Sequence, residues 1–269
     1  MPGRSLPQAA LQAVLLALAL AGASACELAF SSFKAEARDE WTKTFDLAAP
    51  GRVEVANHNG TITVERSADA KLHVRAERIA KAGSDQAAKD LLTRIEIKET
   101  VSADSVRLET RTPSRGMFSG HGEVNYVLQV PAAAGVTVDN VNGRVTLRDL
   151  GGRVRAETTN GGIEGRGLSG AVEASTTNGG IDLELEAVAN DGVELDTTNG
   201  GIRLRLPETA RADLSAEVTN GGIDTGGLKV ETVGEASRKR LEGRLNGGGP
   251  RIRLEVTNGG IRLSGKAAS

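Results

Sequence analysis

The sequence predicts an all-β protein: a parallel β-solenoid with about two strands in each coil of 18–21 residues, preceded by a β-rich N-terminal capping subdomain that carries one short helix. Three observations predict this fold. A six-residue phrase, Thr-Thr-Asn-Gly-Gly-Ile or Val-Thr-Asn-Gly-Gly-Ile, occurs five times between residues 158 and 261; apolar residues alternate on both sides of it; and every aromatic residue precedes residue 127. Units of this size cannot bury their apolar face alone, so they must stack on one another.

Each repeat is centred on an asparagine that is followed by glycine. The corner asparagines are Asn142, Asn160, Asn178, Asn199, Asn220 and Asn258, and Asn59 marks a further degenerate copy. Mostly aliphatic residues stand four and six positions before the asparagine and three and five positions after it, and threonine or valine stands two positions before it, which is the alternation of half-buried strands. Each unit therefore predicts two strands that meet at an Asn-Gly corner, where glycine supplies a positive φ.

Two arrangements of these strands remain open. Asn-Gly between alternating segments is a hairpin signal and is compatible with an antiparallel meander. In a parallel solenoid the corners lie over one another, and the asparagines form an internal amide ladder. Like residues in every column favour the solenoid. The spacing of 38 residues between Asn220 and Asn258 predicts one degenerate coil in residues 228–249.

The repeat is interrupted in the N-terminal half. Residues 42–135 contain several alternating segments and a stretch of helical spacing at Ser84–Arg94, with Ser84 as the expected N-cap. We interpret this region as a β-rich capping subdomain that covers the open sheet edge of the solenoid. Residues 26–41 are expected to be a linker, and residues 136–269 are expected to form the Asn-Gly repeat solenoid.

Residues 1–25 have the features of a signal peptide. Arg4 is the only charge, and the apolar run of residues 9–21 is too short to span a membrane. Cys26, the only cysteine, follows Ala23-Ser24-Ala25, which leaves two alternatives. Either Cys26 is lipidated and anchors the protein to a membrane, or an ordinary cleavage releases a soluble periplasmic protein. We adopt the lipoprotein interpretation, which predicts a lipid-anchored protein of the bacterial cell envelope that faces the periplasm or the exterior.

Composition and spacing argue against several classes of function. The formal net charge is -2, and charges of both signs are interspersed, so we expect no nucleic-acid partner. No histidine or cysteine follows Tyr126, and none of the three histidines is spaced with cysteines or carboxylates in a metal or triad pattern. The sequence therefore predicts no catalytic residues, no cofactor and no metal site.

Two outward columns of the repeat are candidates for contact with a partner. A surface contact row of threonines stands one position before each corner asparagine: Thr159, Thr177, Thr198, Thr219 and Thr257. An acidic column stands three positions before it: Glu157, Ser175, Asp196, Glu217 and Glu255. Acids along a solenoid groove are compatible with a carbohydrate-active enzyme. Mixed charges in the column four positions after the asparagine favour an ordinary solvated face instead: Glu164, Asp182, Arg203, Asp224 and Arg262.

Several segments together resemble a known family. They are the run from Tyr126 to Pro131, the segment Val136-Thr137-Val138, the serial Thr-Thr-Asn-Gly-Gly-Ile units and the Gly-Gly-Gly-Pro stretch at Gly247–Pro250. This combination is similar to the bacterial envelope "putative adhesin" family of β-strand-repeat proteins, a domain of unknown function. The resemblance covers roughly residues 45–265 and implies an extracytoplasmic β-solenoid without established catalytic residues.

The function predicted from the sequence is that of a non-catalytic exported envelope protein. It presents a rigid β-repeat surface for adhesion or scaffolding, and its partner is an envelope protein or a glycan. Two alternatives stay open: a solenoid carbohydrate-active enzyme, and an accessory protein of envelope stress or assembly. The sequence leaves open the oligomeric state and whether the coil end near Ile261–Leu263 docks to another copy.

Overall fold

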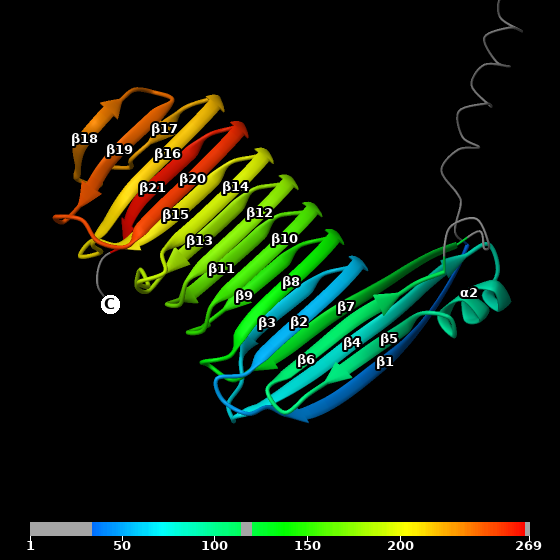
Figure 1. Cartoon of the computed structure of the whole chain (residues 1–269). Helices are drawn as coiled ribbons and strands as arrows, with labels where there is room; N and C mark the ends of the chain where they lie inside the picture. Colours follow the sequence, from blue (N-terminus) through cyan, green and yellow to red (C-terminus); the bar gives the residue numbers. More distant parts are fainter. Residues whose placement is uncertain (1–33, 114–119, 267–269) are drawn as a thin grey trace, which may run out of the picture.

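The computed structural model describes residues 34–113 and 120–266, and it consists of two long sheets that face each other (Figure 1). Sheet A has ten strands in the order β1 (Ala35–Asp46), β4 (Lys71–Ala82), β7 (Gly120–Val130), β3 (Ile62–Arg66), β9 (Val145–Arg148), β11 (Ile163–Leu168), β13 (Ile181–Leu185), β15 (Ile202–Pro207), β21 (Ile261–Lys266) and β17 (Ile223–Asp224). The predicted signal peptide and Cys26 lie outside the described residues.

Sheet B has eleven strands. Their order is β18 (Val230–Ala236), β19 (Arg240–Leu245), β16 (Ala212–Asn220), β20 (Arg251–Asn258), β14 (Val193–Asn199), β12 (Val172–Asn178), β10 (Val154–Asn160), β8 (Gly135–Asn142), β2 (Arg52–Asn59), β6 (Ser105–Arg111) and β5 (Glu96–Val101). Each coil consists of one strand from sheet B and the following strand from sheet A, as in β10 and β11. The chain crosses from one sheet to the other at the Asn-Gly corner.

Neighbouring coils pair in parallel and in register. Asn160 pairs with Asn178 in sheet B, and Ile163 pairs with Ile181 in sheet A. The prediction of a parallel solenoid is therefore confirmed, and the antiparallel meander is excluded for these coils. Inward residues such as Val154, Ala156 and Ile163 are at most 1% exposed and belong to one continuous aliphatic core between the sheets.

The coils do not stack in the order of the sequence. In space the order is β6/β7, β2/β3, β8/β9, β10/β11, β12/β13, β14/β15, β20/β21 and β16/β17. At the C-terminal end the chain leaves the stack after β17, forms β18 and β19, and returns to insert β20 and β21 between two coils already in place. The last coil in the sequence is consequently an inner coil of the stack.

The prediction of a degenerate coil in residues 228–249 is wrong. These residues form the β18–β19 pair, in which β19 runs antiparallel to β16 at the edge of sheet B. The physical reason is that β16 ends the parallel stack and its free backbone groups need a partner. Leu241 and Leu245 of β19 are buried and close this end of the core.

The N-terminal cap is built from antiparallel strands and the helix α2 (Asp85–Leu92). β1 and β4 extend sheet A, β5 extends sheet B, and α2 packs on β4 and β1 (Figure 1). The Ser84 side chain accepts a hydrogen bond from the Ala87 N–H at 3.3 Å, so it caps the helix. The cap shares both sheets with the repeats: β2/β3 and β6/β7 are coils of the same stack.

The linker expected at residues 26–41 is wrong from Ala35 onward. Ala35 to Trp41 form the first half of β1, which pairs with β4 over twelve residues. Trp41 is half-buried and packs against the core, and Phe45 in the second half of β1 is buried. Residues 35–41 form a strand for two reasons. They hydrogen-bond to the edge of β4 that β7 leaves free, and the strand brings Trp41 and Phe45 against the core.

No helix in residues 34–113 and 120–266 has the length and apolar character needed to cross a membrane.

We predict that alkaline pH destabilises the fold through Tyr126, the only tyrosine in the chain. Its side chain is buried, its hydroxyl lies 2.7 Å from the Thr110 hydroxyl, and burial raises its pKa to about 12. An exposed phenol has a pKa of about 10. Stability that is present below about pH 10 is therefore lost as the pH rises toward 12, by up to about 3 kcal/mol.

The check is an absorbance titration of tyrosinate combined with urea unfolding at several alkaline pH values. Tyr126→Phe should remove most of the alkaline loss of stability. A native titration midpoint equal to that of the unfolded chain would contradict the prediction.

Candidate functional site

The corner asparagines lie in one column along the edge at which the strands of sheet B end. The side-chain Nδ2 of each donates to the Oδ1 of the neighbour on its N-terminal side in the stack. The chain of bonds runs from Asn220 to Asn258, Asn199, Asn178, Asn160, Asn142 and Asn59, with distances of 2.8–2.9 Å, and ends with a 3.1 Å bond from Asn59 Nδ2 to the Gly122 carbonyl. The amides are thus aligned in one direction.

The ladder is not internal, and the expectation that it would be is corrected here. Asn160, Asn178, Asn199, Asn220 and Asn258 are exposed, while Asn142 and Asn59 are half-buried. The interior polar column stands two positions earlier, where Thr158, Thr176 and Thr197 are at most 5% exposed. The chain turns away from the core between the inward threonine and the asparagine. The asparagine therefore reaches the surface, although the strict alternation of the strand would place it inside.

The inward threonines hold the corners together. Thr176 Oγ1 donates to the Gly161 carbonyl and Thr197 Oγ1 to the Gly179 carbonyl, both at 2.9 Å. The corner glycines leave no space for a side chain: a Cβ on Gly179 would lie 1.9 Å from the Gly161 oxygen. The sequence contained a signal for this buried hydrogen bond in the Thr-Thr doublet. Only the first threonine of the doublet is separated from the buried residues of its strand by an even number of positions, so only that one points inward.

Asparagine replaces this inward threonine in two coils at the N-terminal end of the repeats. Asn140 Nδ2 donates to the Gly60 carbonyl at 3.0 Å and to the Gly143 carbonyl at 3.2 Å. Asn57 Nδ2 makes the corresponding pair of bonds to the carbonyls of Asn59 and Val124. The Oδ1 atoms of both side chains are buried acceptors without a donor among the described residues.

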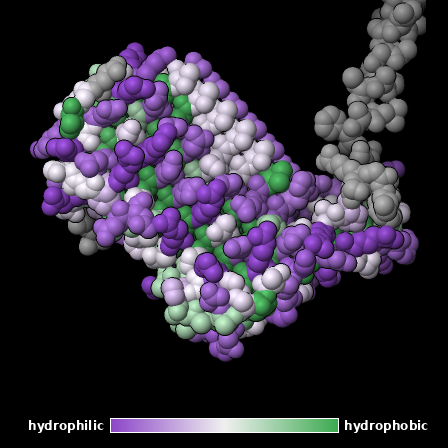
Figure 2. All heavy atoms as spheres, in the orientation of Figure 1, coloured by the Kyte–Doolittle hydropathy of each residue, from purple (hydrophilic) through white to green (hydrophobic). Residues whose placement is uncertain are grey.

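The predicted threonine row lies on the outer face of sheet B, directly beside the amide ladder. In stack order it reads Thr159, Thr177, Thr198, Thr257 and Thr219. Thr198 is half-buried and the others are exposed. Figure 2 shows a pale band of intermediate hydropathy along the edge where β8 to β16 end, within a largely hydrophilic face. The row is therefore an uncharged, hydroxyl-bearing stripe on a polar surface.

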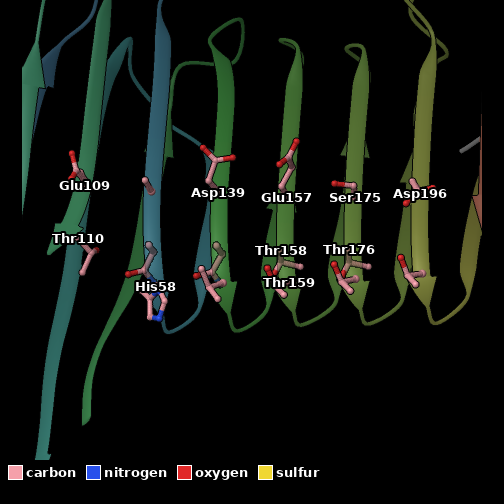
Figure 3. A pocket seen from close by; sticks show the side chains of 16 residues that line it. His58, Glu109, Thr110, Asp139, Glu157, Thr158, Thr159, Ser175, Thr176 and Asp196 are labelled. Carbon is pink, nitrogen blue, oxygen red and sulfur yellow. The ribbon is translucent and has the colours of Figure 1, made fainter. Parts of the chain in front are cut away.

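The row borders a shallow hollow of about 480 Å³ on the outer face of sheet B (Figure 3). Strands β6, β2, β8, β10, β12 and β14 contribute to it. Its lining includes His58, Thr110, Thr159, Thr177 and Thr198 together with the carboxylates of Glu109, Asp139, Glu157 and Asp196. Strand register aligns Asp139, Glu157, Ser175 and Asp196 in one column across the hollow.

Some carboxylates of this column form an ion pair with an arginine and others do not. Glu157 forms an ion pair with Arg155, Glu255 pairs with Arg253 at 2.5 Å, and Glu217 pairs with Arg240 at 2.9 Å. By contrast, neither Asp139 nor Asp196 makes a salt bridge with any residue that the structure describes.

The environment of the two unpaired carboxylates disfavours their charged form. Partial burial and the neighbouring Glu157 raise the pKa of Asp139, and partial burial and Glu255 raise the pKa of Asp196. Within residues 34–113 and 120–266, no group of three or more histidine, cysteine, aspartate or glutamate side chains is placed to hold a metal ion. The hollow thus holds two carboxylates that form no ion pair among the described residues, although Arg155 and Arg107 act on Asp139, and Arg253 acts on Asp196, at longer range.

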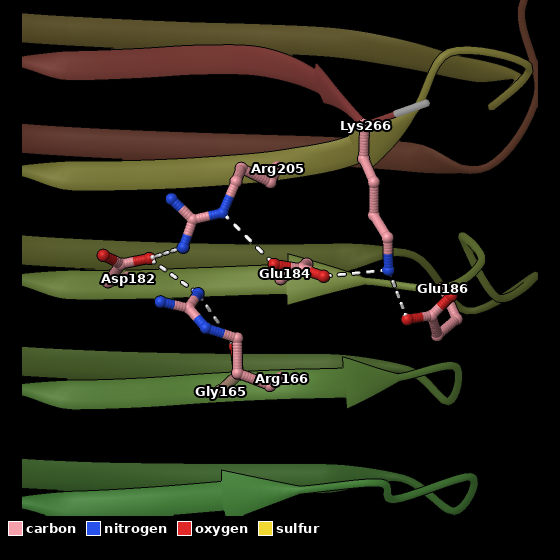
Figure 4. Close-up of polar contacts among 7 residues, drawn as sticks. All are labelled: Gly165, Arg166, Asp182, Glu184, Glu186, Arg205 and Lys266. Carbon is pink, nitrogen blue, oxygen red and sulfur yellow. Dashed lines mark hydrogen bonds and ion pairs between the residues drawn. The ribbon is translucent and has the colours of Figure 1, made fainter. Parts of the chain in front are cut away.

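The outer face of sheet A is organised differently (Figure 4). Asp182 accepts hydrogen bonds from Arg166 at 3.0 Å and from Arg205 at 2.8 Å. Glu184 pairs with Arg205 and with Lys266, whose Nζ lies 2.8 Å away, and Lys266 lowers the pKa of this carboxyl. The network joins β11, β13, β15 and β21, so it ties the inserted coil to its neighbours and neutralises its own carboxylates.

His73 stands beside a carboxylate, contrary to the expectation from the sequence. Its Nε2 lies 3.0 Å from both carboxylate oxygens of Asp69, and its Nδ1 lies 3.1 Å from Thr44 Oγ1. The Lys71 N–H and the Ser67 hydroxyl lower the pKa of Asp69 to about 2. His73 and Asp69 side chains are 36% and 52% exposed. Because water reaches this chain of groups, we assign it to the turn between β3 and β4 rather than to a nucleophile site.

The repeats match a known family. The match is to the Toastrack DUF4097 family and covers residues 152–264, from β10 to β21. Residues 152–264 are therefore similar to a Toastrack DUF4097 domain. A comparison with curated proteins found no match.

Solved structures similar to this chain include three from bacteria. A putative cell adhesion protein from Clostridium sporogenes has 14% identity and a TM-score of 0.51, covering 86% of this chain and 100% of its own. Putative adhesins from Bacteroides fragilis and Parabacteroides merdae, each with 11% identity, have TM-scores of 0.32 and 0.24 and cover 86% and 84% of this chain and 99% and 96% of their own. The first of these supports a shared fold for the Toastrack domain and its cap.

We predict that the two threonines of one doublet differ in their contribution to stability. Thr176→Val removes the hydroxyl that donates to the part-buried Gly161 carbonyl, and should lower the free energy of unfolding by about 1–3 kcal/mol. Thr177→Val, the matched control on the outer face, should change it by less than about 0.5 kcal/mol.

Urea unfolding of both variants at one pH measures the difference. Equal effects of the two substitutions would show that the inward hydroxyl does not hold the corner.

Proposed function

We propose that this protein is a non-catalytic component of the bacterial envelope that contacts a partner through the outer face of sheet B. The threonine row carries the proposal: five hydroxyl side chains lie in register beside a continuous amide ladder. Their backbone is hydrogen-bonded within a sheet of parallel coils, so neighbouring hydroxyls are held at the strand spacing of about 4.8 Å. A rigid surface of this kind loses little conformational entropy when a partner binds.

The chemistry of this face supports adhesion or scaffolding rather than turnover. Threonine hydroxyls donate and accept hydrogen bonds, which suits contact with a protein or a glycan. Among the described residues the exposed large hydrophobic side chains are Val101 and Val233, which lie on the edge strands β5 and β18 at opposite ends of sheet B. Recognition on the outer face would therefore depend on polar groups.

Export and a lipid anchor at Cys26 complete the proposal. The signal-like segment of residues 1–25 and the position of Cys26 at its end support both. Metabolic labelling with a fatty-acid analogue should tag the wild-type protein and leave Cys26→Ser unlabelled. Label that persists in the variant would refute lipidation of this residue.

Site-specific photo-crosslinking in cells tests the contact surface. A photoreactive amino acid at position 177 should capture a discrete partner, because Thr177 is an exposed member of the row with a neighbour on each side. The matched control is position 146, because Thr146 in β9 points outward from sheet A, opposite Thr63 and Glu164 of the adjoining strands. A partner captured from position 146 but not from position 177 would place the contact on the other sheet and contradict the proposal.

A further inference from the structure

The charges on the outer face of sheet B are arranged in rows. The row three positions before the corner reads, in stack order, Glu109, Ala56, Asp139, Glu157, Ser175, Asp196, Glu255 and Glu217, and contains no cation. The row five positions before it supplies Arg155 and Arg253, which pair with members of the acidic row. These arginines also pair with Glu173 and Glu194 of their own row, so they are shared.

Two carboxylates of the hollow are left over from this pairing. Asp139 and Asp196 make no salt bridge to a described residue, and the residues between them in the same row are Glu157, which Arg155 holds, and Ser175. The rest of the lining consists of hydroxyl-bearing side chains together with Glu109, His58, Ala56, Val141 and the largely buried Asn57 and Asn140. The hollow is therefore a polar surface with two separate carboxylates that have no ion-pair partner among the described residues.

We propose that this hollow binds an extended, lysine-bearing segment of a partner polypeptide, which lies along the solenoid axis and places ammonium groups on Asp139 and Asp196. The proposal rests on the contact surface proposed above and names the partner chemistry that fits it. Charge complementarity is the reason for this choice, since an ammonium group at each position would neutralise a charge that the protein leaves unpaired.

The spacing of the two carboxylates sets the spacing of the lysines. Asp139 is on β8 and Asp196 is on β14, three strands apart, so their backbones are separated by about 14 Å. An extended polypeptide advances about 3.3 Å per residue. Lysines four residues apart span about 13 Å and match the separation, whereas lysines two apart span only about 7 Å.

Two further observations support a cationic occupant. Local desolvation and a neighbouring carboxylate raise the pKa of both aspartates, so a bound cation would favour their charged form. The threonine row lies beside the charges and offers hydrogen bonds to the backbone of the bound segment. The outer face of sheet A lacks this combination around Asp182 and Glu184, because arginines and Lys266 already neutralise them.

Fluorescence anisotropy with labelled synthetic peptides tests the inference on the purified full chain. A peptide of strand-forming residues with two lysines four apart should bind at low salt more tightly than the same peptide with lysines two apart. Asp139→Asn combined with Asp196→Asn should weaken binding about tenfold, the order expected for two exposed charge pairs. Glu217→Gln is the matched control: it lies in the same row, two strands from Asp196, and is paired with Arg240, so it should bind within about threefold of the wild type.

The outcomes separate this inference from the proposed function. Failure of the wild type to bind the four-spaced peptide, or unchanged binding by the double variant with an intact circular dichroism spectrum, would overturn the lysine-bearing partner. Spermine that binds as tightly as the peptide would assign the charges to a small polyamine and also overturn it. The proposed contact surface remains supported after either result if position 177 still forms a crosslink in cells. Absence of that crosslink would contradict the proposed function whatever the peptide measurements show.

Discussion

Close stacking of the Asn-Gly corners sets the register of the whole molecule. A corner glycine approaches the backbone of the next coil so closely that a side chain cannot fit, as at Gly179, and an inward threonine donates to the carbonyl exposed by that approach. The asparagine amides add a second, parallel line of hydrogen bonds at the surface. Since a slip of one residue would exchange the buried and exposed faces of every strand, these contacts and the aliphatic columns specify the same register.

The two ends of the stack follow from the same constraint. Parallel coils leave unpaired strand edges at each end of the stack. The chain covers both sheets with antiparallel strands at the N-terminal end, through β1, β4 and β5, and covers sheet B with β18 and β19 at the other end, where sheet A ends with β17. To form these strands the chain must leave the stack and return. As a result, β6/β7 lies outside β2/β3 at one end of the stack, and β16/β17 lies outside β20/β21 at the other end. Lys266, near the end of the inserted coil, pairs with Glu184 and Glu186 and ties that coil to β13 and to the segment after it.

The outer faces of the two sheets have different chemical properties on the same scaffold. On sheet A, acids and bases of successive coils neutralise one another across the strands. On the coils of sheet B from β8 to β14, the arginines lie farther from the corner, so Asp139 and Asp196 form no ion pair among the described residues and stand beside a row of hydroxyls. A repeat protein can change its surface in this way without changing its fold, because outward positions do not take part in stacking.

The sequence by itself determined the local pattern: two strands in each unit, like residues in every column, a helix capped by Ser84 and glycine at each corner, whereas it favoured parallel pairing without excluding a meander. These features depend on residues that are near one another in the chain or identical from unit to unit. The order of the coils, the hairpin at residues 230–245, the exposure of the amide ladder and the His73–Asp69 contact were decided only by the tertiary structure. Nearly identical units do not specify which unit stacks on which. The stacking order decides which arginines lie beside Asp139 and Asp196, and therefore whether these carboxylates form ion pairs.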